Sequence, residues 1–100
     1  MDPRMMRQLQ QMQNKLMKAQ EELGTTMVEG TAGGVVRVVM NGHRELQSIT
    51  IEPEAVDPED VESLQDTLIA AFNDASKKAQ ELSEQKLGGL TGGMNIPGLF

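Results

Sequence analysis

Residues 25–53 are the only part of this 100-residue chain with the pattern of β-strands, and segments that favour helix lie on both sides. The segment is rich in β-branched residues and contains Asn41-Gly42, a dipeptide typical of tight hairpins. The predicted strands are residues 25–30, 35–40 and 49–52, with a glycine-rich turn at 31–34. Short strands joined by tight turns form an antiparallel sheet. The sequence therefore predicts an α+β fold with a three-stranded antiparallel sheet.

The apolar positions of the second and third strands indicate how the two strands pair. A four-residue loop over residues 41–44 would place five apolar side chains on one face: Val36, Val38, Met40, Ile49 and Ile51. The other face would carry Arg37, Ser48 and Thr50 together with Val35, Val39 and Leu46. A two-residue loop would divide the apolar residues less cleanly, so we predict the longer loop.

The first helix is predicted over residues 3–23, which contain no β-branched residue and consist almost entirely of good helix formers. Pro3 fits the first turn, and Gly24 is predicted to follow the last helical residue. Apolar residues alternate at spacings of four and three and form a seam: Met5, Leu9, Met12, Leu16, Ala19 and Leu23. A heptad seam packs on the chain's own core or on a partner helix, and its narrowness favours a helix of a second subunit.

The second long helix is predicted to begin with Asp57 as N-cap and Pro58 as its first residue, followed by acidic residues that the helix dipole favours. Its apolar residues recur at helical spacing: Val61, Leu64, Leu68, Phe72, Ala75, Ala79 and Leu82. This face is expected to cover the apolar face of the sheet. Gly88-Gly89 is expected to end the helix, so residues 1–87 would form a single α+β domain and residues 88–100 a flexible tail dispensable for folding.

Composition limits both the core and the class of protein. The chain has two aromatic residues, eight methionines and no cysteine. This predicts a thin, adaptable core that a second subunit helps to stabilise, and it excludes disulfides and thiol chemistry. No apolar run is long enough to span a membrane, and no signal segment is recognisable. We expect a cytoplasmic protein without a membrane partner.

No pattern of an enzyme or of a cofactor site occurs. His43 has no nucleophile pattern nearby and is expected to be a solvated turn residue. The acidic stretch lacks the alternating ligands and central glycine of a calcium loop, and the glycine-rich segments lack the spacing and lysine of phosphate-binding loops. The sequence therefore predicts no catalytic residue, metal, cofactor or small-molecule substrate.

The net charge of -6 is unevenly distributed along the chain. Residues 1–20 hold four basic residues and one acidic residue, a local charge of +3, whereas the other 80 residues hold five basic and 14 acidic residues, a local charge of -9. The four basic residues form a basic stripe on one side of the first helix: Arg4, Arg7, Lys15 and Lys18. The stripe is equally consistent with two interpretations. It is either an ordinary solvated face or a surface that reaches phosphates and, with Gln11 and Asn14, base edges.

The chain resembles the YbaB/EbfC family of bacterial nucleoid-associated proteins. The resemblance covers essentially the whole chain, from a Gln- and Met-rich helical start through the motifs EGTAGG, NG, DPED and AFNDASKKAQE to the tail GGLTGGMNIPG. It implies a homodimer shaped like tweezers, with a compact body and projecting helices. It also implies DNA binding and a role in nucleoid organisation and gene expression.

In this family the helical segments are thought to contact DNA. Carried over to this sequence, the contacts fall on the basic stripe, Arg4, Arg7, Lys15 and Lys18, and more weakly on Lys77, Lys78 and Lys86. The hairpin would then serve as the rigid body and dimer platform, with Arg37 and Arg44 as accessory charges.

The sequence is consistent with two functions. The first is a non-enzymatic homodimer that binds double-stranded DNA at the nucleoid. The alternative is a protein-interaction or scaffold module whose seam and acidic helix bind another protein without contacting nucleic acid. The alternative accounts better for the negative net charge, and the first accounts better for the segregation of charge and for the resemblance. RNA in place of DNA also stays open, because no feature reads a 2′-hydroxyl.

Overall fold

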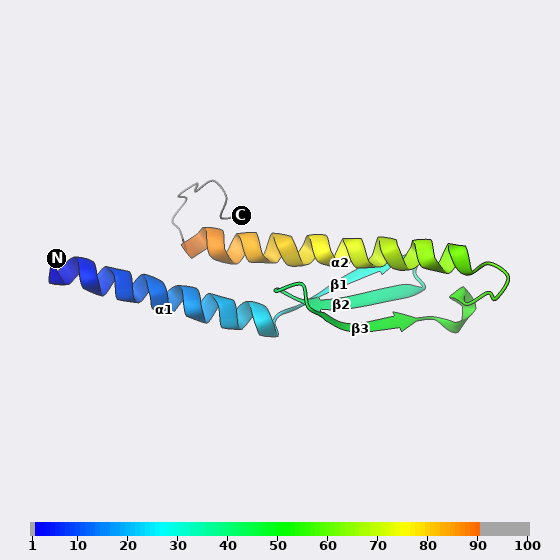
Figure 1. Cartoon of the computed structure of the whole chain (residues 1–100), viewed down its shortest axis with the longest axis horizontal. Helices are drawn as coiled ribbons and strands as arrows, with labels where there is room; N and C mark the ends of the chain where they lie inside the picture. The colour runs from blue at the N-terminus through cyan, green and yellow to red at the C-terminus, as the bar shows by residue number, and fades with distance from the viewer. Residues whose placement is uncertain (1, 91–100) are drawn as a thin grey trace.

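Two long helices flank a small sheet in the computed structural model, which describes residues 2–90 (Figure 1). The elements are α1 (Pro3–Thr25), β1 (Met27–Ala32), β2 (Val36–Asn41), β3 (Leu46–Ile51), the short 3-10 helix η1 (Pro53–Ala55) and α2 (Val61–Leu90). The strands form one antiparallel sheet in the order β1-β2-β3, which confirms the predicted α+β class. α2 runs along the sheet and continues beside α1, so the molecule is elongated, 69 × 24 × 15 Å.

Helix α1 begins as predicted and ends two residues later than predicted. Asp2 is the N-cap, its carboxylate accepting the Arg4 N–H at 3.0 Å, and Pro3 occupies the first turn. The prediction that Gly24 follows the helix is wrong, because α1 continues to Thr25. The Glu22 carbonyl accepts the Thr26 N–H and both threonine hydroxyls, from Thr25 at 3.2 Å and from Thr26 at 2.6 Å. These bonds close the last turn without a left-handed glycine.

The pairing of β2 with β3 confirms the predicted apolar face and moves the loop by one residue. Val36 pairs with Ile51 and Val38 with Ile49, so these four residues share one face of the sheet, as predicted. The register then shifts, and Leu46 pairs with Met40 instead of lying on the face of Arg37.

The loop between β2 and β3, residues 42–45, has the predicted four residues but lies one residue later than predicted, and it is built around the side chain of Asn41. The Asn41 side-chain oxygen accepts the N–H groups of His43 and Glu45, each at 3.0 Å. The glycine-rich turn between β1 and β2 also lies slightly later than predicted, since β1 includes Thr31 and Ala32. Gly33 and Gly34 supply the positive φ angles of that turn.

Both ends of α2 differ from the prediction. Asp60, not Asp57, receives the Ser63 N–H, at 3.3 Å, and the helix begins at Val61. Asp57 instead accepts the Glu59 N–H in the preceding turn. At the other end the helix passes through Gly88-Gly89 to Leu90, since neither glycine takes a positive φ that would break it. The predicted tail beyond Leu90 lies outside the described residues.

Helix α2 packs closely on β1 and β2 and leaves β3 largely uncovered. The central cluster consists of Val36, Val38 and Met40 from β2 with Ala71 and Ala75 from α2. Within residues 2–90, four of the eight buried apolar residues are alanines, so the core is thin, as composition predicted. The prediction that α2 covers the whole apolar face holds only in part, because Ile49 and Phe72 stay nearly half exposed.

The close approach of α2 to β1 depends on Gly30. A Cβ atom at Gly30 would lie 2.3 Å from the Ala71 carbonyl oxygen and 2.3 Å from the Ala75 nitrogen, both atoms of the α2 backbone. A Cβ atom at Gly24 in α1 would meet only the His43 ring, at 3.5 Å, an ordinary contact.

We therefore expect alanine at these two positions to act in opposite directions. Gly30→Ala should lower the free energy of unfolding by about 2–4 kcal/mol, because α2 must move off β1. Gly24→Ala should raise it by up to about 1 kcal/mol, because alanine favours the helix. Urea unfolding followed by circular dichroism measures both. A destabilised Gly24→Ala variant would contradict the helical assignment of Gly24.

Candidate nucleic-acid interface

The basic stripe lies on one exposed face of α1. Arg4, Arg7, Lys15 and Lys18 are all exposed. At about 3.6 residues per turn, these four side chains fall within an arc of about 80° around the helix axis, and the apolar seam is centred about 120° further round. In Figure 1 the amino-terminal half of α1 projects beyond the end of α2. The stripe therefore presents four cationic groups on one side of α1, two of them, Arg4 and Arg7, in the half that projects.

At the carboxyl-terminal end of the seam, α1 packs on the chain's own α2 and on the end of β2. Ala19 and Leu23 are buried, at 6% and 1% exposure, where α1 contacts these elements. Met5 and Leu9 are more than half exposed. Of the two alternatives for the seam, packing on the chain's own body thus holds for its last residues. Pairing with a second subunit stays a prediction for the amino-terminal part.

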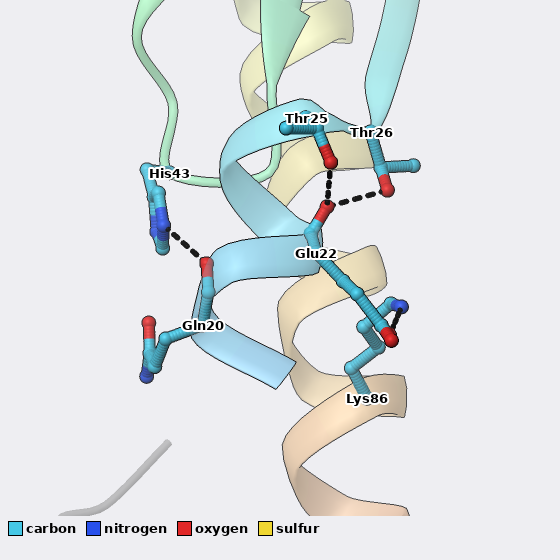
Figure 2. A network of polar contacts seen from close by, with 6 residues as sticks. All are labelled: Gln20, Glu22, Thr25, Thr26, His43 and Lys86. Carbon is cyan, nitrogen blue, oxygen red and sulfur yellow. Dashed lines mark hydrogen bonds and ion pairs between the residues drawn. The ribbon is translucent and has the colours of Figure 1, made fainter. Parts of the chain in front are cut away.

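Lys86, one of the weaker candidates, binds α1. Its ammonium lies 2.5 Å from the Glu22 carboxylate (Figure 2). The hydrogen bond and the charge of Lys86 lower the pKa of Glu22, and Lys18 contributes to the same effect. Lys86 therefore connects the end of α2 to the last turns of α1.

Lys78, another weaker candidate, binds the edge of the sheet. Its ammonium donates to the Glu29 carbonyl at 2.9 Å and pairs with the Asp74 carboxylate at 3.1 Å. Asp74 also accepts the Thr31 N–H at 3.1 Å. The Thr31 N–H, and after it Lys78, lower the pKa of Asp74. These two α2 side chains thus occupy backbone groups of β1, an edge strand that would otherwise leave them unpaired.

The remaining cationic residues lie on the body. Lys77 is exposed, next to Lys78 on α2. Arg37 pairs with Glu29 across β1 and β2 at 3.0 Å, and Arg44 donates to Gln80 of α2. The exposed basic residues that share one face are therefore those of α1, and the three candidates on α2 do not extend that face as a group.

The β2–β3 loop contacts α1 in a way that sequence reasoning missed. Gly42 donates its N–H to the Leu23 carbonyl at 2.7 Å, and the Asn41 side chain donates to the Gly24 carbonyl at 3.2 Å. His43 is exposed, as expected for a turn residue, but its Nε2 lies 2.8 Å from the Gln20 carbonyl. A carbonyl only accepts, so Nε2 carries the hydrogen. The one feature of the sequence that could have indicated these contacts was that the last carbonyls of a helix need hydrogen-bond donors.

Among residues 2–90, no three His, Asp or Glu side chains are grouped so that they could hold a metal ion. No helix within the same residues is long and apolar enough to cross a membrane.

Comparison with known proteins identifies the family. The model of the YbaB/EbfC DNA-binding family matches residues 1–94. The chain belongs to the YbaB/EbfC DNA-binding family. This confirms the resemblance inferred from the motifs, and the family is described by DNA binding and not by a catalytic activity.

Relatives and a solved structure are similar over nearly the full length. The chain is 62% identical to a nucleoid-associated protein of Roseiflexus sp. (strain RS-1), over 98% of this chain and 99% of that protein. It is 61% identical to a nucleoid-associated protein of Chloroflexus aurantiacus (strain ATCC 29366 / DSM 635 / J-10-fl), over 96% of this chain and 95% of that protein. The fold is similar to the crystal structure of the uncharacterized protein HP0035 from Helicobacter pylori, with a TM-score of 0.77 and 27% identity, over 91% of this chain and 98% of that chain.

Acid is expected to weaken the contact between α2 and β1. The pKa of Asp74 lies below its ordinary value of 3.8. Its carboxylate therefore stabilises the fold fully above that value, and the stabilisation is lost as the pH falls through the lowered pKa of the folded chain. Asp74→Asn should be less stable than the parent near neutral pH, and the difference should shrink in acid.

Urea midpoints at several values between about pH 6 and pH 3 measure this difference. Asp66→Asn, on an exposed position of the same helix, controls for the removal of a carboxylate. A difference between Asp74→Asn and the parent that is the same at every pH would contradict the prediction.

Proposed function

We propose that this member of the family binds double-stranded DNA as a homodimer through the basic stripe of α1, and that it acts at the bacterial nucleoid, in the cytoplasm, in DNA organisation and gene expression. The observation that carries the proposal is the placement of all four basic residues of α1 on one exposed face of this helix, whose amino-terminal half projects beyond α2. The family description and the names of the relatives support the same function.

The dimensions of the stripe suit a duplex. From Arg4 to Lys18 the helix rises about 21 Å. This length corresponds to roughly six base pairs at 3.4 Å per step. Four cations over this length can neutralise phosphates along one side of a groove, and each neutralised phosphate releases condensed counterions. Such contacts position a protein on DNA without reading its sequence.

A second copy of the chain would double this contact. An apolar groove of about 430 Å³ lies between β3 and α2, where α2 leaves the sheet uncovered, and its lining includes Ile49, Ile69 and Phe72. Ile69 is 59% exposed in a single chain. Burying such side chains against their copies would stabilise a dimer and hold two α1 helices at a fixed separation.

The competing function is a protein-interaction module. The exposed amino-terminal part of the seam, with Met5 and Leu9, favours it, since an apolar helix face is a common docking surface for another helix. The two functions differ in what happens when the charge of the stripe is removed and the seam is left intact.

DNA binding is expected to depend steeply on salt and on the stripe. With about four to six phosphate contacts per dimer, affinity for duplex DNA should fall about 100- to 1,000-fold between 50 and 200 mM salt. Arg7→Gln with Lys15→Gln keeps helix propensity and the seam, so the fold should persist, affinity should fall and the salt dependence should become shallower. Gel-shift titrations with duplex DNA, duplex RNA and single strands measure this.

The matched control removes the same two charges from the body. Arg37→Gln with Lys77→Gln should change affinity and salt dependence much less than the variant of the stripe. If the Arg7 and Lys15 variant binds duplex DNA as tightly as the parent, with the same salt dependence, the stripe is a solvated face and the protein-interaction function is favoured.

The groove is expected to mediate the dimer. Light scattering should give the parent a mass near twice that of the chain. Ile69→Asp should shift the mass toward a single chain, because a carboxylate would have to be buried unpaired in the interface. Val61→Asp introduces the same charge at an exposed residue at the start of α2, outside the groove, and should leave the dimer intact. A parent that runs as a single chain would remove the two-helix mechanism.

A further inference from the structure

The carboxyl-terminal end of α1 is held by two separate elements of the body (Figure 2). From one side, the His43 ring of the β2–β3 loop donates to the Gln20 carbonyl at 2.8 Å. From another, Lys86 of α2 contacts the Glu22 carboxylate at 2.5 Å. We call the group formed by Gln20, Glu22, His43 and Lys86 the arm clamp.

The helix end depends on these partners from elsewhere in the chain. The last turn of α1 contains no basic residue, and its C-cap Thr26 has an extended conformation. Donors for the carbonyls of Leu23 and Gly24 come from Gly42 and Asn41, in the same loop that carries His43. A Cβ atom at Gly42 would lie 2.7 Å from Leu23, so this loop fits tightly against the helix. The loop therefore determines where α1 leaves the body.

A small rotation of α1 at its carboxyl-terminal end causes a large displacement of its amino-terminal end. The rise from Glu22 to Arg4 is about 27 Å, so a rotation of about 10° at the clamp would move Arg4 by roughly 5 Å. This displacement is larger than the 3.4 Å rise of a base pair. The direction of α1 must be held closely if four cations are to meet phosphates together.

We propose that the arm clamp sets the direction of α1 and so places the basic stripe on DNA, with His43, Glu22 and Lys86 as positioning residues. This proposal rests on the proposed function for its effect on DNA binding. It assigns Lys86 to holding α1 through Glu22, whereas the family resemblance implied a weak contact of Lys86 with DNA.

Substitution of Glu22 distinguishes the two roles of Lys86. Glu22→Met keeps the length and helix propensity of the side chain but leaves Lys86 without its carboxylate, and it makes the chain one charge more positive. If Lys86 contacts phosphate directly, DNA binding should tighten. If Lys86 acts through the clamp, binding should weaken.

Substitution of His43 tests the other half of the clamp without changing the formal charge, in which histidine counts as neutral. His43→Ala removes the donor to Gln20. His43→Gln supplies an amide N–H at a similar reach and should restore the contact. Gln47→Ala is the matched control. Gln47 is an exposed residue near the same loop, and its side chain donates to the Glu45 carbonyl.

The direction of α1 can be measured directly. Because the chain has no cysteine, Gln10→Cys and Gln65→Cys take nitroxide labels at two exposed sites, one on each long helix. Gln11 and Gly89 line the same cleft, so the label at residue 10 lies close to the Gly89 end of α2. The two labels should therefore lie roughly 35 Å apart, which is the rise of α2 from Gln65 to Gly89. Pulsed electron resonance on labelled chain diluted with unlabelled chain gives the distance distribution within one chain.

The parent and Gln47→Ala should give one narrow distribution. Glu22→Met and His43→Ala should broaden or shift it and weaken duplex binding about 2- to 10-fold, while thermal midpoints show that the body stays folded. His43→Gln should return both values to near those of the parent. An unchanged distribution in both Glu22→Met and His43→Ala, or tighter DNA binding by Glu22→Met, would overturn the proposal. If the parent fails to bind duplex DNA, the proposed function fails, and the distance distributions still decide whether the clamp directs α1.

Discussion

The contact between Gly30 of β1 and the backbone of α2 is the constraint on which the rest of the structure depends. Because no side chain separates the two elements, the helix lies close enough for Asp74 and Lys78 to bind the backbone of β1. The same closeness makes alanine the suitable residue at positions 71 and 75, which are fully buried. With two aromatic residues in the chain and alanine at four of the eight buried apolar positions within residues 2–90, few large side chains contribute to the core. Close approach of backbones and polar side chains that satisfy the edge strand add to the stability of the fold.

The position of α2 in turn governs the position of α1. Once α2 is fixed along β1, its last turns extend beyond the sheet and bring Lys86 to Glu22. The β2–β3 loop, fixed by the same sheet, brings Gly42 and His43 to the carbonyls of α1. The helix that carries the basic stripe is therefore oriented by contacts that all originate in the body. A nucleic-acid interface with few residues can be placed accurately in this way, because its precision derives from the scaffold.

Local pattern predicted much of this architecture, and tertiary contacts account for most of the rest. Alternation of apolar residues predicted the pairing face of Val36 and Val38, and the heptad spacing predicted α1. The predictions failed where a partner from elsewhere in the chain decides the outcome. Gly24 is a good helix terminator in isolation, but the threonines after it and the loop around Asn41 satisfy the carbonyls instead. His43 was expected to be a solvated turn residue and Lys86 a weak DNA contact, because their partners lie 23 and 64 positions away. No spacing rule within one helix or hairpin could have revealed either contact.

The negative net charge, the main argument for the protein-interaction function, loses weight once the shape is known. The acidic stretch between residues 52 and 66 lies around η1 and the start of α2, and α1 begins at the opposite end of a molecule 69 Å long (Figure 1). Exposed charges separated by more than about 8–10 Å are largely screened at physiological salt. A phosphate beside Arg4 or Arg7 therefore responds mainly to the local charge of +3 and little to the total of -6. The distant acids instead disfavour contact of the far end of the body with DNA, which leaves α1 as the favoured point of approach.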